Sequence, residues 1–475
     1  MNLKEDLKNP VFKTIGEIAD SMHREVYTVG GFVRDIFLNR PSKDYDFVTV
    51  GSGIELAEAV ARHFGSKAHL SVFPNYGTAQ VKYRDLELEF VGARRESYNR
   101  DSRNPVVEDG SLEDDMKRRD FTINAMAVSL NADTFGELLD PFNGLIDLHS
   151  GIIRTPLDPD ITFSDDPLRM LRAIRFATQL YKPSDNNTGD PIYSFRISPE
   201  TFSAIKRNAG RMEIITRERI NDELSKIMKA SKPSIGWRLL DMSGLLPYVF
   251  PSLIPLKGVE MKEGKGHKDN FYHTIQVVDN VAARSDNEWL RWAALLHDIA
   301  KPTTKRYDPK LGWTFHNHNF VGEKMIPRIF RKMKLPLNEK MKYVSKLVGL
   351  HMRPQSVGEE GVSDSAVRRM LTDAGNDVED LMILAESDIT SKQPEKVRRQ
   401  LEGFKKLRER MQCVHDADAL RNWKNPIDGN EIMDKLGIPP GPEIARLKDL
   451  VKEAIIEGQI PYDHDSAWQY LLDHR

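Results

Sequence analysis

The 475-residue sequence lacks several features that would assign a protein to a class at once. Cys413 is its single cysteine, which excludes an internal disulfide and a cysteine-rich zinc knuckle. No apolar run reaches the roughly 18 residues needed to span a bilayer. The start, MNLKEDLKNP, has no basic-then-apolar signal pattern. We therefore expect a soluble, cytoplasmic protein without a membrane partner.

An excess of one charge is also missing, because 69 Lys and Arg stand against 71 Asp and Glu. Contact with a nucleic acid would need local basic patches. The pattern of the chain predicts an α+β N-terminal head with a mixed β-sheet and helices, followed by an all-α remainder. Strands are expected at Val26 to Val29, Asp46 to Val50 and Leu86 to Val91, and helices dominate from Asp166 onward.

The segment VGGFVRDIFLNRPSKDYDFVTVG carries the first chemistry. Gly30 and Gly31 lack a Cβ and let backbone N–H groups approach a triphosphate, and Arg34 adds a cation. Asp44 and Asp46 lie two apart on an expected strand, so both carboxylates face one side and offer hard oxygen ligands for Mg²⁺. A lone pair of acids is more often a solvated turn, but the combination favours a phosphoryl-transfer site.

This segment resembles the signature of the class II tRNA nucleotidyltransferase and poly(A) polymerase family, within the DNA polymerase β-like superfamily. The resemblance extends in order to about residue 230 through LEFVGARRESYNRDSRNP, RRDFTINAMA, DPFNGLIDLHSGIIR and RERINDEL. It implies that Glu89 is the third catalytic metal ligand, and that Arg119, Asp120 and Asn124 contact the ribose and phosphates of the nucleotide.

The segment SDDPLRMLRAIRFA predicts a helix whose acids can cap it and whose Arg169, Arg172 and Arg175 share one side. We expect these three arginines to bind the nucleotide. Cytosine and adenine both present an amino donor beside a ring-nitrogen acceptor, which a carboxylate next to a guanidinium complements. In the family the matching motif is Glu-Asp-x-x-Arg. The resemblance makes Asp166 and Arg169 the base-reading pair, while Asp165 stands where Glu is usual.

Six of the 13 histidines fall between residues 267 and 351. In FYHT, LLHDIAKP, FHNHNFVGEK, GLHMRP and LAESDIT, imidazoles accompany carboxylates, a transition-metal ligand set. Their order resembles an HD phosphohydrolase domain. That resemblance implies a first metal, Mn, Ni, Fe or Zn, on His273, His297, Asp298 and Asp388, with His318 and His351 available for a second. His267 and His316 are less well placed.

These resemblances, with Pro and Gly punctuation, divide the chain into four segments. They are a nucleotidyltransferase head (1–155), a helical neck that reads the nucleotide and binds RNA (156–255), an HD metal-binding domain (256–392) and a helical C-terminal body that binds tRNA (393–475). Lys392 to Arg410 holds eight Lys or Arg against three Glu, and Arg328 to Lys342 is also basic. Solvated helix faces are the plainer interpretation, but the local surplus favours RNA contact.

The sequence therefore predicts an enzyme that adds CCA to the 3′ end of tRNA from CTP and ATP, with release of pyrophosphate. The resemblance leaves two roles open for the HD domain: a phosphatase or 2′,3′-cyclic phosphodiesterase activity, or a scaffold without catalysis. A poly(A) polymerase and a CC-only or A-only enzyme share the head motifs and stay open. An HD phosphohydrolase with a nucleotide-binding head and a noncatalytic RNA-binding protein are disfavoured by Asp44, Asp46 and Glu89. The oligomeric state cannot be read from the sequence.

Overall fold

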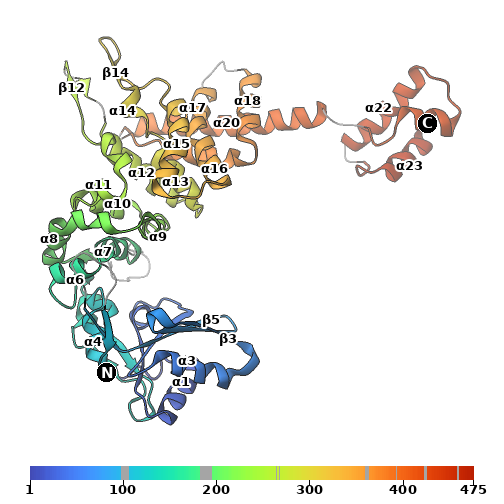
Figure 1. The fold of residues 1–475 in the computed structure, drawn as a ribbon. Helices are drawn as coiled ribbons and strands as arrows, with labels where there is room; N and C mark the ends of the chain where they lie inside the picture. Colours follow the sequence, from blue (N-terminus) through green and yellow to red (C-terminus); the bar gives the residue numbers. More distant parts are fainter. Residues whose placement is uncertain are drawn as a thin grey trace. The chain divides into compact units, whose positions relative to one another are not determined.

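The head of the protein is built on a seven-stranded sheet of order β3-β4-β5-β2-β1-β8-β9 (Figure 1). This is a computed structural model, which describes residues 1–97, 106–181, 195–263, 265–266, 268–358, 363–391, 393–421, 425–456 and 459–475. The strands are β1 (Val26–Val29), β2 (Asp44–Thr49), β3 (Ala68–Phe73), β4 (Thr78–Tyr83), β5 (Leu86–Gly92), β8 (Ala127–Ser129) and β9 (Leu138–Leu139). Strands β2 and β5 run parallel and the other neighbours antiparallel, so the expected mixed sheet is confirmed.

Side chains alternate between the two sides of β2, so one face of the sheet is apolar and the other carries the acidic side chains. Phe47 stacks on Phe90 of β5, with ring centroids 5.0 Å apart, and packs against Phe12 of helix α1 (Pro10–Ser21). On the opposite face Val48 belongs to a core cluster with Leu112 and Met116 of α4 (Leu112–Lys117). Asp44 and Asp46 have the parity of Val48 and therefore lie on that second face.

Short elements complete the head and lead into the helical region. The head also contains α2 (Gly31–Phe37), α3 (Gly53–Phe64), β6 (Arg94–Ser97), β7 (Val106–Asp109), α5 (Gly144–His149), β10 (Ile152–Ile153) and the single-turn helices η1 (Gly65–Lys67), η2 (Pro74–Tyr76), η3 (Thr122–Asn124) and η4 (Ala132–Thr134). The neck follows with α6 (Pro159–Asp165), α7 (Leu168–Gln179), β11 (Arg196–Ile197), α8 (Pro199–Asn208), η5 (Ala209–Ile214), α9 (Arg217–Met228), α10 (Ser234–Met242), α11 (Leu246–Val249) and η6 (Pro251–Leu256).

The region expected to resemble an HD domain is helical, as predicted, with two small hairpins. Its helices are α12 (Asn270–Ala282), α13 (Glu288–Leu296), α14 (Lys301–Thr304), α15 (His318–Met333), α16 (Glu339–Leu350), α17 (Arg353–Val357), η7 (Gly375–Asp377) and α19 (Val378–Ser387). The hairpins are β12 (Met261–Lys262) with β13 (Lys265–Gly266), and β14 (Arg306–Asp308) with β15 (Gly312–Thr314). Trp237 and Phe250 of the neck pack on Trp292 of α13, and all three are fully buried. The neck and this region therefore share an aromatic core.

The chain divides into two compact units. The first comprises Met1–Gln355 with Ala374–Leu401. It contains all the elements above up to α16, with η7 and α19. The second unit comprises Ser356–Asp373 with Glu402–Arg475. The second has α18 (Asp364–Ala374), the later part of α20 (Pro394–Arg421), α21 (Gly429–Leu436), α22 (Pro442–Ile456) and α23 (His464–His474). Its last three helices enclose a core that includes Ile432, Leu447 and Leu471. Along the described part of the chain, no helix combines the length and apolarity needed to cross a membrane.

Candidate functional site

Three carboxylates come to adjacent parallel strands of the head. In the register between β2 and β5, Asp46 pairs with Glu89 and Asp44 pairs with Glu87. Burial raises the pKa of Asp46, and Asp44 raises it further, although Arg119 opposes the shift. Burial also raises the pKa of Glu89, and Asp46 adds to that effect. These carboxylates lie on one sheet face and hinder one another's ionisation. A hard cation bound between them would relieve this repulsion, and carboxylate oxygens are suitable ligands for it.

The three head carboxylates do not converge as tightly as a preformed ligand set. Among the described residues, two groups of three have ligand atoms that all lie within 4.8 Å of one another, and both belong to the helical region. The head carboxylates are not such a group. Their register and common face, rather than close contact, support the predicted magnesium seat.

Gly30, in the turn between β1 and α2, lies beside the sheet face that carries the carboxylates. Its φ is +74°, a conformation that side chains rarely adopt, and it precedes helix α2. A Cβ on Gly30 would lie 3.2 Å from Nη1 of Arg119 and 3.5 Å from Oδ2 of Asp46. Arg119 is held in turn by Asp115, at 2.9 Å. The glycine therefore lets a guanidinium and a carboxylate of the site approach the backbone closely.

Four of the predicted nucleotide-binding residues form one continuous network. Nη1 of Arg34 donates to Oδ1 of Asn124 over 2.8 Å, and Nδ2 of Asn124 donates to Asp120 over 3.0 Å. Nε of Arg172 donates to the other carboxylate oxygen of Asp120 over 2.7 Å. Burial opposes ionisation of Asp120, but Arg172 and Asn124 lower its pKa to about 2. The network connects helices α2 and α7 through the segment before β8.

Phe176 of α7 contacts three of the predicted nucleotide-binding arginines, and the sequence analysis did not single it out. The guanidinium carbons of Arg34, Arg172 and Arg175 lie 5.2, 5.6 and 3.9 Å from its ring centroid. Arg175 also pairs with Glu223 of α9 at 2.5 Å. A phenylalanine on an amphipathic helix reads as ordinary core, so no signal in the sequence distinguished it. Its ring stacks against cations from two helices.

The predicted base-reading pair is only partly engaged within the protein. Asp166 accepts from the Leu168 N–H at 3.1 Å, which confirms its capping role, and its other oxygen lies 3.1 Å from Arg219 of α9. Arg169 has no side-chain hydrogen bond or ion pair among the described residues. The sequence identifies the α9 motif but gives no sign that Arg219 itself contacts Asp166.

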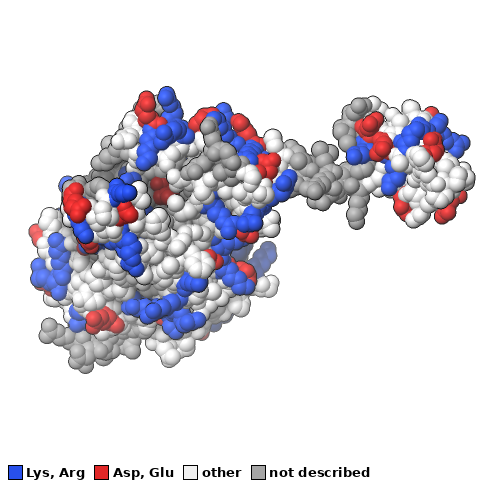
Figure 2. Space-filling view, turned by 90° about the horizontal axis from the view of Figure 1, so that it is seen from above, with Lys and Arg blue, Asp and Glu red and all other residues white. Residues whose placement is uncertain are grey.

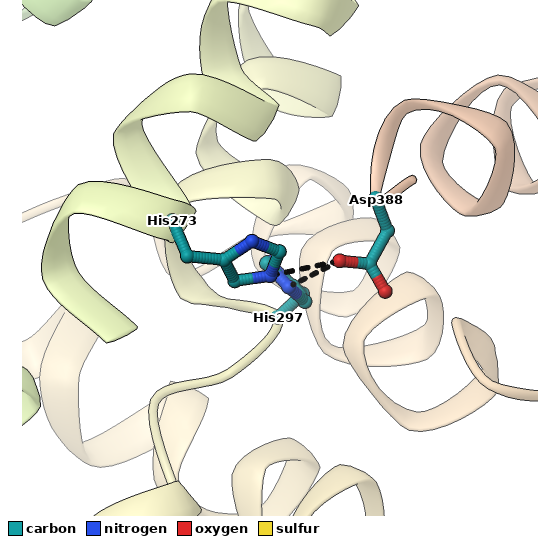
Figure 3. A group of neighbouring side chains, drawn as sticks. All are labelled: His273, His297 and Asp388. Carbon is teal, nitrogen blue, oxygen red and sulfur yellow. Dashed lines mark ion pairs between the residues drawn. The ribbon is translucent and has the colours of Figure 1, made fainter. Parts of the chain in front are cut away.

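All six predicted histidine and aspartate ligands of the helical region come together. Nε2 of His273, on α12, lies 2.9 Å from Asp388, which follows α19, and 3.4 Å from Asp298. Nε2 of His297, after α13, lies 3.2 Å from Asp298 and 3.4 Å from Asp388. Figure 3 shows His273 and His297 converging on Asp388.

The ring nitrogens of three histidines are arranged as metal ligands would be. In His297, His318 and His351, Nδ1 lies 2.7 to 2.8 Å from the carbonyl oxygen of the residue three positions earlier. Because Nδ1 donates to the backbone, Nε2 is the ring nitrogen that faces the cluster, and it can bind a metal once its proton has been lost. Nε2 of His318 and His351 are 3.2 Å apart, and Nε2 of the fully buried His297 faces the carboxylates of Asp298 and Asp388. These residues fit a bound metal.

Asp298 lies between two groups of three possible metal ligands. The groups are His273 with His297 and Asp388, and Asp298 with His318 and His351. One oxygen of Asp298 faces His297, whereas the other lies 3.3 Å from His318. The expected grouping of Asp298 with His273 and His297 corresponds to its Oδ2, which lies 3.4 and 3.2 Å from their Nε2 atoms. The contact of its Oδ1 with His318 is additional.

Electrostatics of the cluster follow from its burial. Burial alone would lower the pKa of His297, but Asp298 and Asp388 raise it to about 10. Burial and the neighbouring His297 lower the pKa of His351 to about 4. Burial opposes ionisation of Asp298, yet His297 and Lys301 hold its pKa well below the ordinary value.

Two further residues support the cluster. Lys301 pairs with Asp298, and Thr390 lies 2.8 Å from Nδ1 of His273. The spacing of Lys301 from Asp298 in HDIAK could have identified it, whereas Thr390 has no signal in the sequence. His316 is exposed and outside the cluster, and His267 lies outside the described residues.

Three family models match this chain. A poly A polymerase head domain matches residues 26–154, a probable RNA and SrmB-binding site of polymerase A matches residues 194–256, and an HD domain matches residues 270–423. They confirm the resemblances that the motifs carried. A head and an HD domain of these kinds imply a dependence on divalent metals.

Curated relatives and solved structures agree with these family models. The chain is 32% identical over 322 residues to a multifunctional CCA protein of Shewanella frigidimarina, covering 66% of this chain and 70% of the relative. It is 42% identical over 208 residues to an A-adding tRNA nucleotidyltransferase of Aquifex aeolicus, covering 43% of this chain but only 23% of that protein. A crystal structure of a tRNA nucleotidyltransferase complexed with a primer tRNA and an incoming ATP analog matches with a TM-score of 0.58 and 26% identity, over 83% of this chain and 98% of that one. This chain belongs to the tRNA nucleotidyltransferase and poly(A) polymerase family.

Proposed function

We propose that this protein adds CCA to the 3′ end of tRNA, using CTP and ATP and releasing pyrophosphate. The observation that carries the proposal is the pairing of Asp46 with Glu89 on adjacent strands, on the face where Gly30 and Arg119 meet. The match to the multifunctional CCA protein covers 66% of the chain, whereas the match to the A-adding enzyme covers 43%. Addition of all three nucleotides is therefore favoured over addition of A alone.

The roles of the residues follow from their places. Asp44, Asp46 and Glu89 would hold Mg²⁺, which supplies charge neutralisation at the leaving pyrophosphate and lowers the pKa of the attacking hydroxyl. Backbone N–H groups after Gly30, with Arg34 and Arg119, would bind the triphosphate. Asp120 and Asn124 would position the ribose, since Arg172 and Arg34 fix their orientation. In this proposal the four segments 1–155, 156–255, 256–392 and 393–475 act as head, neck, HD domain and tRNA-binding body.

The direct test is the product itself. A tRNA that ends at the discriminator base is incubated with the protein and all four nucleotides, and the 3′ extensions are sequenced. We expect C, C and A in that order. Addition of A alone, of CC alone or of a long A tract would identify the A-adding, CC-adding or poly(A) alternatives instead.

Base selection is proposed to rest on Asp166 and Arg169. Asp166 would accept from the amino group of cytosine or adenine, and Arg169 would donate to the adjacent ring nitrogen. Arg169 is half-buried at the start of α7 and forms no side-chain hydrogen bond or ion pair with a described residue, although its charge helps to lower the pKa of Asp120. Arg219 would orient Asp166 from α9.

We expect Arg169→Ala to weaken use of both CTP and ATP by about 1 to 3 kcal/mol per lost contact, and to reduce the preference for CTP over UTP. Single-nucleotide incorporation on a tRNA lacking CCA measures each ratio. Arg196→Ala, which removes an exposed arginine of β11, is the control. An unchanged preference in the Arg169 variant would assign base reading to other residues.

The reverse design tests the same pair. Exchanging the two residues, Asp166→Arg with Arg169→Asp, should raise UTP or GTP use relative to CTP. The exchange needs Arg219→Gln as well, because the introduced guanidinium would otherwise face Arg219, which lies 3.1 Å from Asp166.

A second activity is proposed for the HD region, on the separate observation that six buried or half-buried ligands converge there. We propose that these residues hold Mn, Ni, Fe or Zn, which would supply an activated water for hydrolysis of phosphate esters. Lys301, beside Asp298, would bind a substrate phosphate. The substrates would be phosphomonoesters or 2′,3′-cyclic phosphates at RNA ends.

A further inference from the structure

Helix α15 has a basic face that neither catalytic site uses. Phe320, Lys324, Arg328 and Arg331 are exposed and recur at intervals of three or four residues, so their side chains share one stripe of the helix. The opposite side is buried through Gly322, Ile326, Ile329, Phe330 and Met333. We name Phe320, Lys324, Arg328 and Arg331 the α15 stripe.

The α15 stripe is not neutralised by the protein. None of its three cations forms an ion pair with a described residue, and the exposed Lys332 and Lys334 extend the charge. Glu323 is the single acid between residues 320 and 334. Its carboxylate points away from the stripe, because a Cβ on Gly349 of α16 would meet it at 2.5 Å. Elsewhere, exposed lysines such as Lys43 and Lys82 are paired with carboxylates.

The position of the α15 stripe separates it from the chemistry of the HD region. His318 begins the same helix and is buried in the metal-ligand cluster. Phe320 is two residues, or about 200° of helical rotation, away and is 54% exposed. The stripe therefore faces solvent on the side of α15 opposite to the cluster.

We propose that the α15 stripe binds the sugar–phosphate backbone of RNA. From Lys324 to Arg331 the helix rises about 10 Å, which spans roughly three successive phosphates of one strand. The ring of Phe320 lies 4.1 Å from Nζ of Lys324, so an aromatic face stands at the end of the row of cations. Cations beside an exposed aromatic ring are the surface that binds RNA without reading its sequence.

Because the chain as a whole carries almost no net charge, it can attract RNA only through local groups of cations. The net charge is −2, and Lys and Arg gather in separate clusters on the face shown in Figure 2 rather than covering it. A carboxylate-free row of cations can therefore add affinity where the molecule as a whole attracts RNA weakly. This inference rests on the proposal that an RNA is the substrate. It assigns the stripe affinity and no catalytic step.

Salt dependence of binding tests the proposal. We compare the wild-type protein with Lys324→Ala/Arg328→Ala/Arg331→Ala, and with the control Lys4→Ala/Lys8→Ala/Lys13→Ala, which removes three exposed cations interspersed with Glu5, Asp6 and Glu17. The probe is a tRNA transcript lacking CCA, titrated by fluorescence anisotropy between about 50 and 200 mM salt.

The stripe variant should bind on the order of tenfold or more weakly at low salt, with a slope of log K against log salt reduced by about 2 to 3. Nucleotide addition at saturating tRNA should keep the wild-type rate, and the control should keep the wild-type slope. An unchanged slope in the stripe variant, or an equal loss in the control, would overturn the proposal. Loss of binding to vesicles containing anionic lipid, with tRNA binding intact, would also overturn it.

These outcomes distinguish a failure of this inference from a failure of the proposed function. If the wild-type protein bound tRNA through the stripe but added no nucleotides, the proposed function would fail while this inference stood. If the wild-type protein added nucleotides but the stripe variant kept the wild-type salt slope, the proposed function would stand while this inference failed.

Discussion

Asp46→Asn is expected to slow addition of CMP and AMP by on the order of 10³-fold or more, with tRNA binding largely retained. The amide keeps the volume of the side chain but removes the charge that would hold a divalent cation beside Glu89, its partner in the parallel register. Asp44→Asn should have a similar effect. In phosphoryl transfer, positioning and charge stabilisation supply most of the rate, so loss of one carboxylate ligand acts mainly on catalysis.

The matched control for this experiment lies on the same sheet face. Glu87→Gln changes the residue opposite Asp44 on β5, a glutamate that pairs with Lys82 at 3.0 Å. It should leave the rate near the wild-type value. Single-turnover incorporation from CTP, with a tRNA-binding titration for each variant, provides the measurement. A nearly normal rate for Asp46→Asn would remove this residue from the catalytic site.

The double substitution His297→Ala with Asp298→Ala is expected to abolish the hydrolytic activity proposed for the HD region and to prevent binding of the metal proposed there. Both side chains are buried, with 0% and 1% exposure, and Asp298 faces both triads of the cluster. After both substitutions Asp388 keeps His273 as a partner, but Lys301 loses Asp298, so the fold of the double variant has to be checked. Hydrolysis should fall on the order of 10³-fold or more. Nucleotide addition should persist, because the proposed catalytic carboxylates lie on the head sheet.

His316→Ala is the control, because His316 is exposed and outside the cluster. Metal content by elemental analysis, and hydrolysis of a phosphomonoester and of a 2′,3′-cyclic nucleotide, are measured for each purified variant. Circular dichroism establishes that the double variant is folded. A folded double variant with full metal content and hydrolysis would show that the cluster is not the hydrolytic site.

Periodicity made much of the head predictable. The two-residue spacing of Asp44 and Asp46 predicts that both lie on one face of a strand, and both belong to β2. The glycine turn before α2 and the run of helices after Asp166 followed from equally local signals. The sequence places the β-rich run at Asp46 to Val50 with Asp44 on the same strand, and β2 spans Asp44–Thr49. Its parallel pairing with β5 extends the strand, and pairing across a sheet is not encoded in local pattern.

The sequence by itself determined which residues could carry chemistry: their side chains, their spacing within each helix or strand, and the six candidate ligands of the HD region. Tertiary structure alone decided how they meet. It placed Arg219 against Asp166, gathered three guanidinia around Phe176, and turned the two oxygens of Asp298 toward different triads. The physical reason is range. Spacing within a helix or strand follows from backbone geometry over a few residues, whereas contacts such as the one between Asp166 and Arg219 depend on how whole helices pack.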